Sequence, residues 1–142
     1  MKAKRELREV VLDYLSQHNT MTLATVHNNS PWATSLFYAN KGFTLYFISN
    51  PNVCLHCQNI AANSRVAVTI DENYSLNSLD DWRKVKGIQL EGTAEMLVTE
   101  EEISQAVEVY VRKYPFVSLY LKSIVSFPRV VSFLETMAKK LN

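Results

Sequence analysis

The sequence predicts a mainly β fold, namely a small antiparallel β-barrel with flanking helices. Five segments between residues 21 and 97 have the β-branched and aromatic composition, or the apolar–polar alternation, of strands. The first three are joined by connections of a few residues. Because parallel strands need crossovers of a dozen residues or more, these three form an antiparallel meander. Short strands of this kind leave the fewest open edges when the sheet closes on itself.

The composition is that of one globular domain spanning residues 1–142. Hydrophobic residues make up 47% and charged residues 20% of the chain, which excludes a largely disordered protein. The formal net charge of +1 gives no bulk attraction to nucleic acid or to anionic membranes, and three glycines are too few for a glycine-rich phosphate loop. We expect a cytoplasmic protein without nucleic-acid or membrane partners, since no segment has the pattern of a membrane span or a signal peptide.

The first half of the chain opens with an amphipathic helix over about residues 3–18, followed by the meander. Apolar positions recur at helical spacing at Leu7, Val10, Val11, Tyr14, Leu15 and His18. The strands are expected over 21–26, 32–39 and 43–48, with turns at 27–31 and 40–42. A break at 49–52 then leads to a short helix over about 53–63.

The second half adds two strands and three helices. A fourth strand is expected over 65–70, a polar loop over 71–81, and a fifth strand within 82–97, where Gly92 marks a bulge or a close approach. Thr99 and Glu102 have capping-box spacing and begin a helix that ends before Pro115. Further helical pieces are expected over 117–122 and 130–140.

The cysteines and two of the three histidines favour ordinary structural roles. Cys54 and Cys57 form a single C-x-x-C pair, and a structural zinc site needs four ligands, so we expect no metal and two half-buried thiols on one helix, with a redox pair as the alternative. His18 continues an apolar helix face and is expected to pack there, and His27 lies in a turn and is expected to be exposed.

A possible anion site lies where the third strand passes into the following helix. Ser49 and Asn50 bring hydroxyl and amide groups, and His56 lies near the amino terminus of that helix, which favours anions. These three side chains could hold one phosphate, or they could serve ordinary turn and capping roles. No catalytic triad or pair of catalytic carboxylates can be assembled, so the catalytic residues are unknown.

Several stretches together resemble the pyridoxamine 5′-phosphate oxidase-like FMN-binding split-barrel family, and within it most resemble the small branch of YhbP-like proteins. The matching stretches are MTLATV (21–26), PWATSLFY (31–38), LYFISNP (45–51), HCQNIAANSRVAVTI (56–70) and KGIQLEGTAE (86–95). The resemblance extends over about residues 5–135.

The resemblance implies a homodimer with FMN in clefts between two barrels. It implies that Thr34, Ser35 and Leu36 flank the flavin ring, and that Ser49, Asn50 and His56 face the phosphate. It further implies that the partner copy contributes from the strand containing Gln89, together with Trp82.

Three features depart from the family pattern. Many relatives carry Lys or Arg at position 56, whereas His56 carries less positive charge at neutral pH. The residues that act on pyridoxamine phosphate in the oxidase have no recognisable counterpart. Relatives usually return to the barrel with a last strand, whereas this sequence is expected to lack that strand and to end in the helix over 130–140.

The expected function is FMN binding in the dimer cleft, as a flavin-dependent oxidoreductase of unknown substrate. In such a protein the cofactor supplies the chemistry, and the chain supplies binding and orientation. One alternative is a non-catalytic binding protein for FMN, haem or another planar ligand. Another is a cofactor-free dimeric scaffold.

Overall fold

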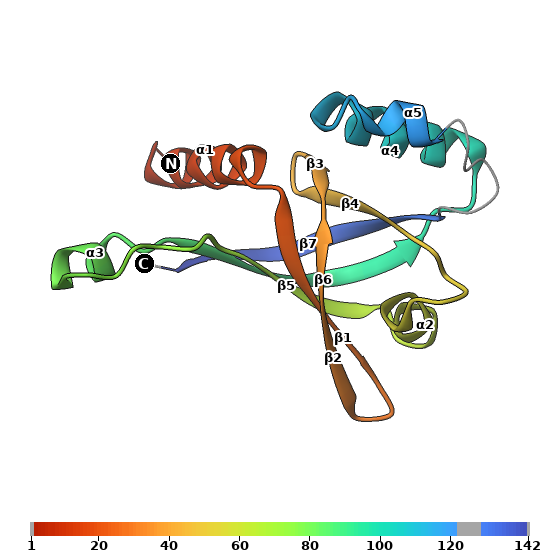
Figure 1. Ribbon diagram of the computed structural model, residues 1–142, viewed down its shortest axis with the longest axis horizontal. Helices are drawn as coiled ribbons and strands as arrows, with labels where there is room; N and C mark the ends of the chain where they lie inside the picture. Colours follow the sequence, from red (N-terminus) through yellow and green to blue (C-terminus); the bar gives the residue numbers. More distant parts are fainter. Residues whose placement is uncertain (1, 122–128, 142) are drawn as a thin grey trace.

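The computed structural model describes residues 2–121 and 129–141, which form seven strands and five helices (Figure 1). In chain order they are α1 (Lys2–Gln17), β1 (Thr20–His27), β2 (Ser30–Phe37), β3 (Ala39–Lys41), β4 (Thr44–Ser49), α2 (Leu55–Ala62), β5 (Arg65–Ile70), α3 (Leu79–Arg83), β6 (Gly87–Met96), α4 (Glu100–Lys113), α5 (Val117–Leu121) and β7 (Arg129–Leu141). The predicted class, mainly β with flanking helices, is confirmed.

The strands form one antiparallel sheet in the order β2-β1-β5-β6-β7-β4-β3. Its two edge strands, β2 and β3, follow each other in the chain and are joined by Tyr38, which is fully buried. The Tyr38 N–H donates to Asn19 O at 3.0 Å. The sheet therefore curls until its edges approach each other at Tyr38, as in a split barrel.

The predicted meander is wrong in one respect, because the strand expected over 32–39 is two strands. β2 pairs with β1, and β3 pairs with β4, so the first and third predicted strands lie in separate parts of the sheet. The physical reason is a change of partner at Tyr38: the pairing with β1 ends there with the Tyr38 N–H to Asn19 O bond, and from Ala39 the chain pairs with β4. Periodicity alone cannot locate a break of one residue inside an apolar run.

The helix expected over 130–140 and the missing last strand are both corrected by β7. This strand pairs with β4 on one side and β6 on the other, and so fills the gap between them. Val130, Val131 and Phe133 favour a strand, and pairing on both sides satisfies backbone groups that a helix would leave open on β4 and β6. The register of β6 and β7 shifts between Glu91 and Gly92, which confirms the bulge expected there.

In the rest of the chain, most of the helix ends and loops predicted from local sequence are confirmed. Thr99 Oγ1 accepts a hydrogen bond from Glu102 N at 3.2 Å, which confirms the cap of α4. The predicted loop over 71–81 gives way at its end to α3, where Ser78 Oγ accepts from Asp81 N at 3.1 Å. No described helix is long and apolar enough to cross a membrane.

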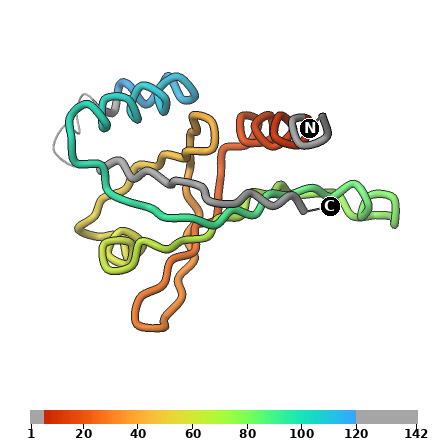
Figure 2. Tube along the Cα trace, turned by 180° about the vertical axis from the view of Figure 1, so that it is seen from behind, coloured from red at the N-terminus to blue at the C-terminus, as the bar shows by residue number. Residues whose placement is uncertain are grey.

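The helices and the β5–β6 connection lie around the sheet in distinct places. α4 and α5 lie at one end, beside β3 and β4, and the β1–β2 hairpin extends at the opposite end (Figures 1 and 2). Residues 71–86, which carry α3 and are called the α3 arm here, project sideways from β5 and β6 (Figure 2). None of the described helices covers one face of β1, β5 and β6.

Candidate functional site

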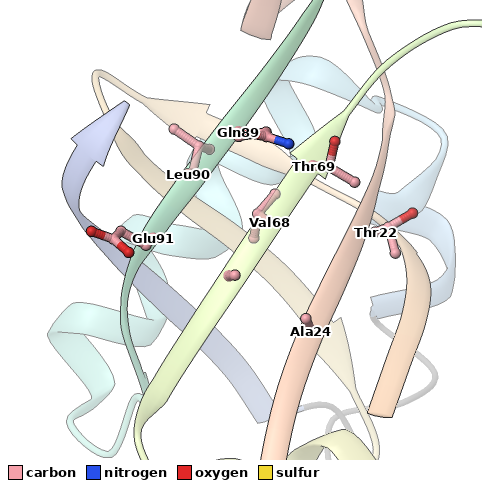
Figure 3. Close-up of a pocket in the computed structure, with 8 residues that line it drawn as sticks. Thr22, Ala24, Val68, Thr69, Gln89, Leu90 and Glu91 are labelled. Atoms are coloured by element: carbon pink, nitrogen blue, oxygen red, sulfur yellow. The ribbon is translucent and has the colours of Figure 1, made fainter. Parts of the chain in front are cut away.

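The uncovered face of β1, β5 and β6 carries a shallow groove lined mostly by small and polar side chains (Figure 3). It encloses about 280 Å³. This groove is called the sheet hollow, and its lining residues are Thr22, Ala24, Ala67, Val68, Thr69, Gln89, Leu90 and Glu91. The alternation of the strands explains it, because Leu23, Val68 and Leu90 fill the core while the neighbouring residues face outward.

Cross-strand register places predicted and unpredicted residues in one polar row of this face. Ser35 pairs with Thr22, Thr22 with Thr69, and Thr69 with Gln89. Residues directly opposite in an antiparallel pair share a face, so the row runs from β2 to β6 on the outer side. Sequence reasoning named Ser35 and Gln89 but missed Thr22 and Thr69, which the outward positions of the expected strands could have identified.

Thr34 and Leu36, the other residues expected at the flavin ring, lie on the opposite face from Ser35. Thr34 pairs with the fully buried Leu23, and Leu36 packs against the core cluster. The Thr34 hydroxyl oxygen is buried and has no hydrogen-bond partner, a state that no other buried side-chain polar atom shares in the described part of the chain. An unpaired buried hydroxyl is costly, and it offers a hydrogen bond to anything that reaches it.

Ser49 and His56 lie together, as expected, but they bind each other inside the protein. Ser49 Oγ and His56 Nε2 are 2.7 Å apart, and the two residues are only 8% and 4% exposed. Burial lowers the pKa of His56, so its imidazole is neutral at pH 7. The pair can therefore provide neutral hydrogen bonds, without a positive charge.

Asn50 shapes the turn between β4 and α2. Its Oδ1 accepts from Asn52 N at 3.0 Å, and its carbonyl oxygen accepts from Val53 N and Cys54 N. These bonds are turn chemistry, one of the two roles that the sequence left open for this group. The structure thus brings Ser49, Asn50 and His56 to one turn, where each has contacts within the chain.

Trp82 and Gln89 lie apart from that turn. Gln89 is exposed in the sheet hollow, and Trp82 is 66% exposed on the α3 arm. Neither hollow that these two residues line includes a residue of the β4–α2 turn. One copy of the chain therefore does not bring all eight predicted residues into one hollow.

The cysteines and the remaining histidines lie where packing or exposure accounts for them. Cys57 is fully buried, Cys54 is half-buried, and burial raises the pKa of the Cys57 thiol to about 11. His18 stacks on Tyr14 and bonds to Tyr14 O and to Glu72, while His27 is exposed in the β1–β2 turn. No cluster of three or more His, Cys, Asp or Glu residues suited to a metal ion occurs within the described ranges.

Solved structures share this fold at low sequence identity. A protein of unknown function from Agrobacterium tumefaciens aligns with 96% of this chain at a TM-score of 0.76 and 22% identity, and the chain spans 56% of its length. A FAD-binding protein from Mesorhizobium loti has a TM-score of 0.70 and 20% identity, with 92% of this chain and 88% of that chain covered. The haem storage protein HutZ from Vibrio cholerae has a TM-score of 0.75 and 14% identity, with 94% and 92% covered.

The family is assigned from the sequence. No curated protein matches the chain. The family model described as pyridoxamine 5′-phosphate oxidase matches residues 7–134, which is most of the chain, although this match does not distinguish the YhbP-like branch. The chain therefore belongs to the pyridoxamine 5′-phosphate oxidase family of split-barrel proteins.

Proposed function

We propose that this protein binds FMN in a cleft shared by two copies of the chain and acts as a flavin-dependent oxidoreductase. The observation that carries the proposal is the unpaired, buried hydroxyl of Thr34, at a position where the family resemblance implies contact with the flavin ring. When bound, FMN would supply the transfer of a hydride or of single electrons. The chain's own part is to bind and orient the ring.

Each predicted residue has a proposed task that its placement allows. At the edge strand β2, Thr34 would donate its unused hydroxyl to the flavin, with Leu36 on the same face of the strand and Ser35 on the opposite face. Ser49 and Asn50 would offer neutral hydrogen bonds to the phosphate. His56 would reach the phosphate through the Ser49 hydroxyl that it already contacts.

The shared cleft is supported by the separation of the two halves of the site. Ser35 and Gln89 lie on strands three spacings apart, which is about 14 Å across the sheet. A second copy that brought its Gln89 and Trp82 toward β2 of the first would complete the site. The exposed side chains of Leu76, Leu79 and Trp82 on the α3 arm suit such a contact.

A haem-binding function is the second candidate, because the structurally similar HutZ is a haem storage protein. Haem is usually held by an axial side-chain ligand, often an imidazole. In this chain both ring nitrogens of His18 have partners, and His56 is buried against Ser49. His27 is exposed but lies on the β1–β2 hairpin turn, so the described imidazoles favour a flavin over haem.

The first experiment is the absorbance spectrum of the purified protein, followed by calorimetric titration with FMN and riboflavin. A flavin spectrum and tighter binding of FMN than of riboflavin are expected. A haem spectrum would favour the second candidate. Failure to bind either flavin or haem would leave a cofactor-free scaffold.

The second experiment tests the shared cleft by complementation between two defective variants. Ser35→Arg and Gln89→Arg alter exposed positions, and each should abolish FMN binding alone. A one-to-one mixture should recover about a quarter of the wild-type sites, because half of the dimers are mixed and each mixed dimer has one intact site. A mixture that recovers no binding would refute a cleft made from two copies.

A further inference from the structure

The α3 arm is joined to the end of α1 by a cluster of hydrogen-bonded side chains. Tyr14 Oη and Tyr74 Oη donate to Lys86 O at 3.1 Å and 2.7 Å, and Lys86 N donates to Tyr74 Oη at 3.1 Å. Tyr74 and Lys86 lie on the two segments of the arm that flank α3, so these bonds hold its base together. A further contact, between His18 and Glu72, joins the arm to the residue that follows α1, and it is called the arm tie here.

The geometry of the arm tie requires a proton on both ring nitrogens of His18. Nδ1 lies 2.7 Å from Tyr14 O, a carbonyl oxygen that only accepts, so Nδ1 is the donor. Nε2 lies 2.9 Å from Glu72 Oε2, and a neutral imidazole with its proton on Nδ1 would present a lone pair to that oxygen. The hydrogen bond with His18 holds the pKa of Glu72 below its ordinary value, so the carboxyl group is ionised at neutral pH. The two contacts together therefore require an imidazolium and a carboxylate.

Glu72 is the charged group that contacts the imidazole ring. The ring of Tyr14 stacks on that of His18, with centroids 3.8 Å apart. Lys113 Nζ, from α4, donates to His18 O and so contacts the backbone of this residue. Asp71 adds a second negative charge on the side of Tyr14. The protonation state of His18 therefore decides whether the arm tie forms.

The arm tie is the part of this cluster that changes with pH near neutrality. Histidine gains and loses its proton in that range, and the side chains of His18 and Glu72 are 14% and 50% exposed, so the proton can exchange with water. Loss of the proton leaves two acceptors facing each other, so the arm tie is closed in mildly acidic solution and open in mildly alkaline solution. The bonds of the tyrosines persist, since burial raises the pKa of Tyr14 further above neutral.

The arm tie lies close to the residues that support Trp82. The indole is 66% exposed and lines a hollow of about 480 Å³ at the base of the arm, together with Asp71 and Lys86. Asp71 is the chain neighbour of Glu72, and Lys86 accepts the tyrosine hydrogen bonds. The walls of this hollow therefore move with the residues that the arm tie holds, and the position of Trp82 depends on it.

We propose that His18 and Glu72 are positioning residues, which hold the α3 arm of each copy where its Trp82 reaches the flavin of the partner copy. The arm tie closes when His18 is an imidazolium and opens when this proton is lost. The proposal rests on the proposed function, and it adds a control by protons to the shared cleft.

The test compares three substitutions of carboxylates on the arm. Glu72→Ala removes the arm tie at every pH. Glu72→Gln keeps a contact that does not depend on the proton, because an amide N–H can donate to the neutral Nε2 of His18 and an amide oxygen can accept from the imidazolium. Asp80→Asn is the matched control, since Asp80 is an exposed carboxylate of the same arm that pairs with Arg83.

Arm position is measured without flavin, and flavin binding is measured separately. The chain has two tryptophans, so in a Trp32→Phe background the fluorescence anisotropy of Trp82 reports motion of the arm. It is recorded at about pH 6 and about pH 8.5, on either side of the range in which histidines titrate. Calorimetric titration with FMN at the same two pH values gives the affinity of each variant relative to the wild type, a ratio from which ionisation of the FMN phosphate cancels.

At the lower pH, Glu72→Ala should reduce the anisotropy of Trp82 and weaken FMN binding about two- to fivefold, the range typical of an exposed ion pair. At the higher pH it should have no effect, because the arm tie is already open in the wild type. Glu72→Gln should match the wild type at the lower pH and bind FMN about two- to fivefold more tightly than the wild type at the higher pH. Asp80→Asn should match the wild type at both.

The proposal is overturned if Glu72→Ala changes neither the anisotropy nor the FMN affinity at the lower pH, or if its effects are equal at the two pH values. A change in anisotropy with unchanged FMN affinity would overturn the role of the arm in flavin binding. If the wild type binds no flavin, the proposed function fails, and the positioning of Trp82 at a flavin fails with it. In that case the anisotropy alone still decides whether the arm tie holds the arm.

Discussion

Replacing Thr34 with Val should make the protein more stable and weaken its binding of FMN. The Thr34 hydroxyl oxygen is buried without a hydrogen-bond partner, and Val has the same shape with a methyl group in its place. Mutational data put the cost of burying an unpaired hydroxyl at about 1–3 kcal/mol. Because Thr34 is only half-buried on the edge strand β2, the lower end applies, so the free energy of unfolding should rise by about 1 kcal/mol.

The two assays are urea denaturation without ligand and calorimetric titration with FMN. A gain of about 1 kcal/mol corresponds to a melting temperature about 3 °C higher for a domain of this size. Loss of one neutral hydrogen bond should weaken FMN binding by about 3- to 10-fold. Thr93→Val, at an exposed position of β6 outside the sheet hollow, is the control and should change stability by less than about 0.5 kcal/mol.

Thr34→Val should raise the unfolding free energy and lower the affinity for FMN, and these opposite effects distinguish a binding role of the hydroxyl from a structural one. A structural hydroxyl would give a loss of stability, because its partner would be left unpaired in the variant. If Thr34→Val lowers the unfolding free energy by 1 kcal/mol or more, the hydroxyl has a partner within the folded chain. Unchanged FMN affinity would remove Thr34 from the flavin site.

Two further predictions concern the buried pair of Ser49 and His56. Ser49→Ala should lower the unfolding free energy by about 1–3 kcal/mol in urea titrations, because it leaves His56 Nε2 buried without a partner, and a change below about 0.5 kcal/mol would contradict the bond at 2.7 Å. Burial lowers the pKa of His56, so below about pH 6.5 this imidazole is protonated in the unfolded chain but still neutral in the folded chain. The free energy of unfolding should therefore fall as the pH drops from about 6.5 toward the pKa of His56 in the folded chain. His56→Gln removes this titration, so the slope of the unfolding free energy against pH should be smaller in the variant, by up to about 1.4 kcal/mol per pH unit. Equal slopes in the variant and the wild type would show that His56 has the same pKa in the folded and unfolded chains.

Local signals in the sequence predicted most elements because their causes lie within a few residues. The cap at Thr99, the bulge at Gly92 and the alternation of β6 depend on neighbouring side chains and were all correct. The two failures, the break at Tyr38 and the strand β7, depend on distant partners. The chain pairs with β1 before Tyr38 and with β4 after it, and β7 lies between β4 and β6, so neither outcome is visible from its own stretch of sequence.

The same distinction holds for the candidate site. The β4–α2 turn could be predicted, because Ser49, Asn50 and His56 lie within eight positions and their contacts are local. The sheet hollow could be predicted only in part, because alternation identifies Thr22, Thr69 and Gln89 as outward positions but strand register alone brings them together. A further hollow at the base of the α3 arm, lined by Arg83 and Lys86, needs both the sheet and the arm, and nothing local marks these two residues as members of it.

The burial of His56 changes where positive charge must come from if the chain holds a phosphate. The phosphate of FMN is mostly dianionic at neutral pH, and charge-assisted hydrogen bonds are about twice as strong as neutral ones. The β4–α2 turn offers Ser49 and a neutral His56, so its contribution is hydrogen bonding without charge. Two hollows share Thr69 on the outer face, namely the sheet hollow and a hollow at the base of the α3 arm. The cations that line them are Arg83 and Lys86, on an arm that projects from its own barrel. If the α3 arm of a second copy lay across the first copy, Arg83 and Lys86 would supply the positive charge that His56 does not carry. A phosphate could then bind without an arginine or lysine at position 56. In that arrangement, affinity for the anion should weaken with rising salt in the wild type, and this dependence should be reduced in Arg83→Gln/Lys86→Gln but retained in Lys84→Gln.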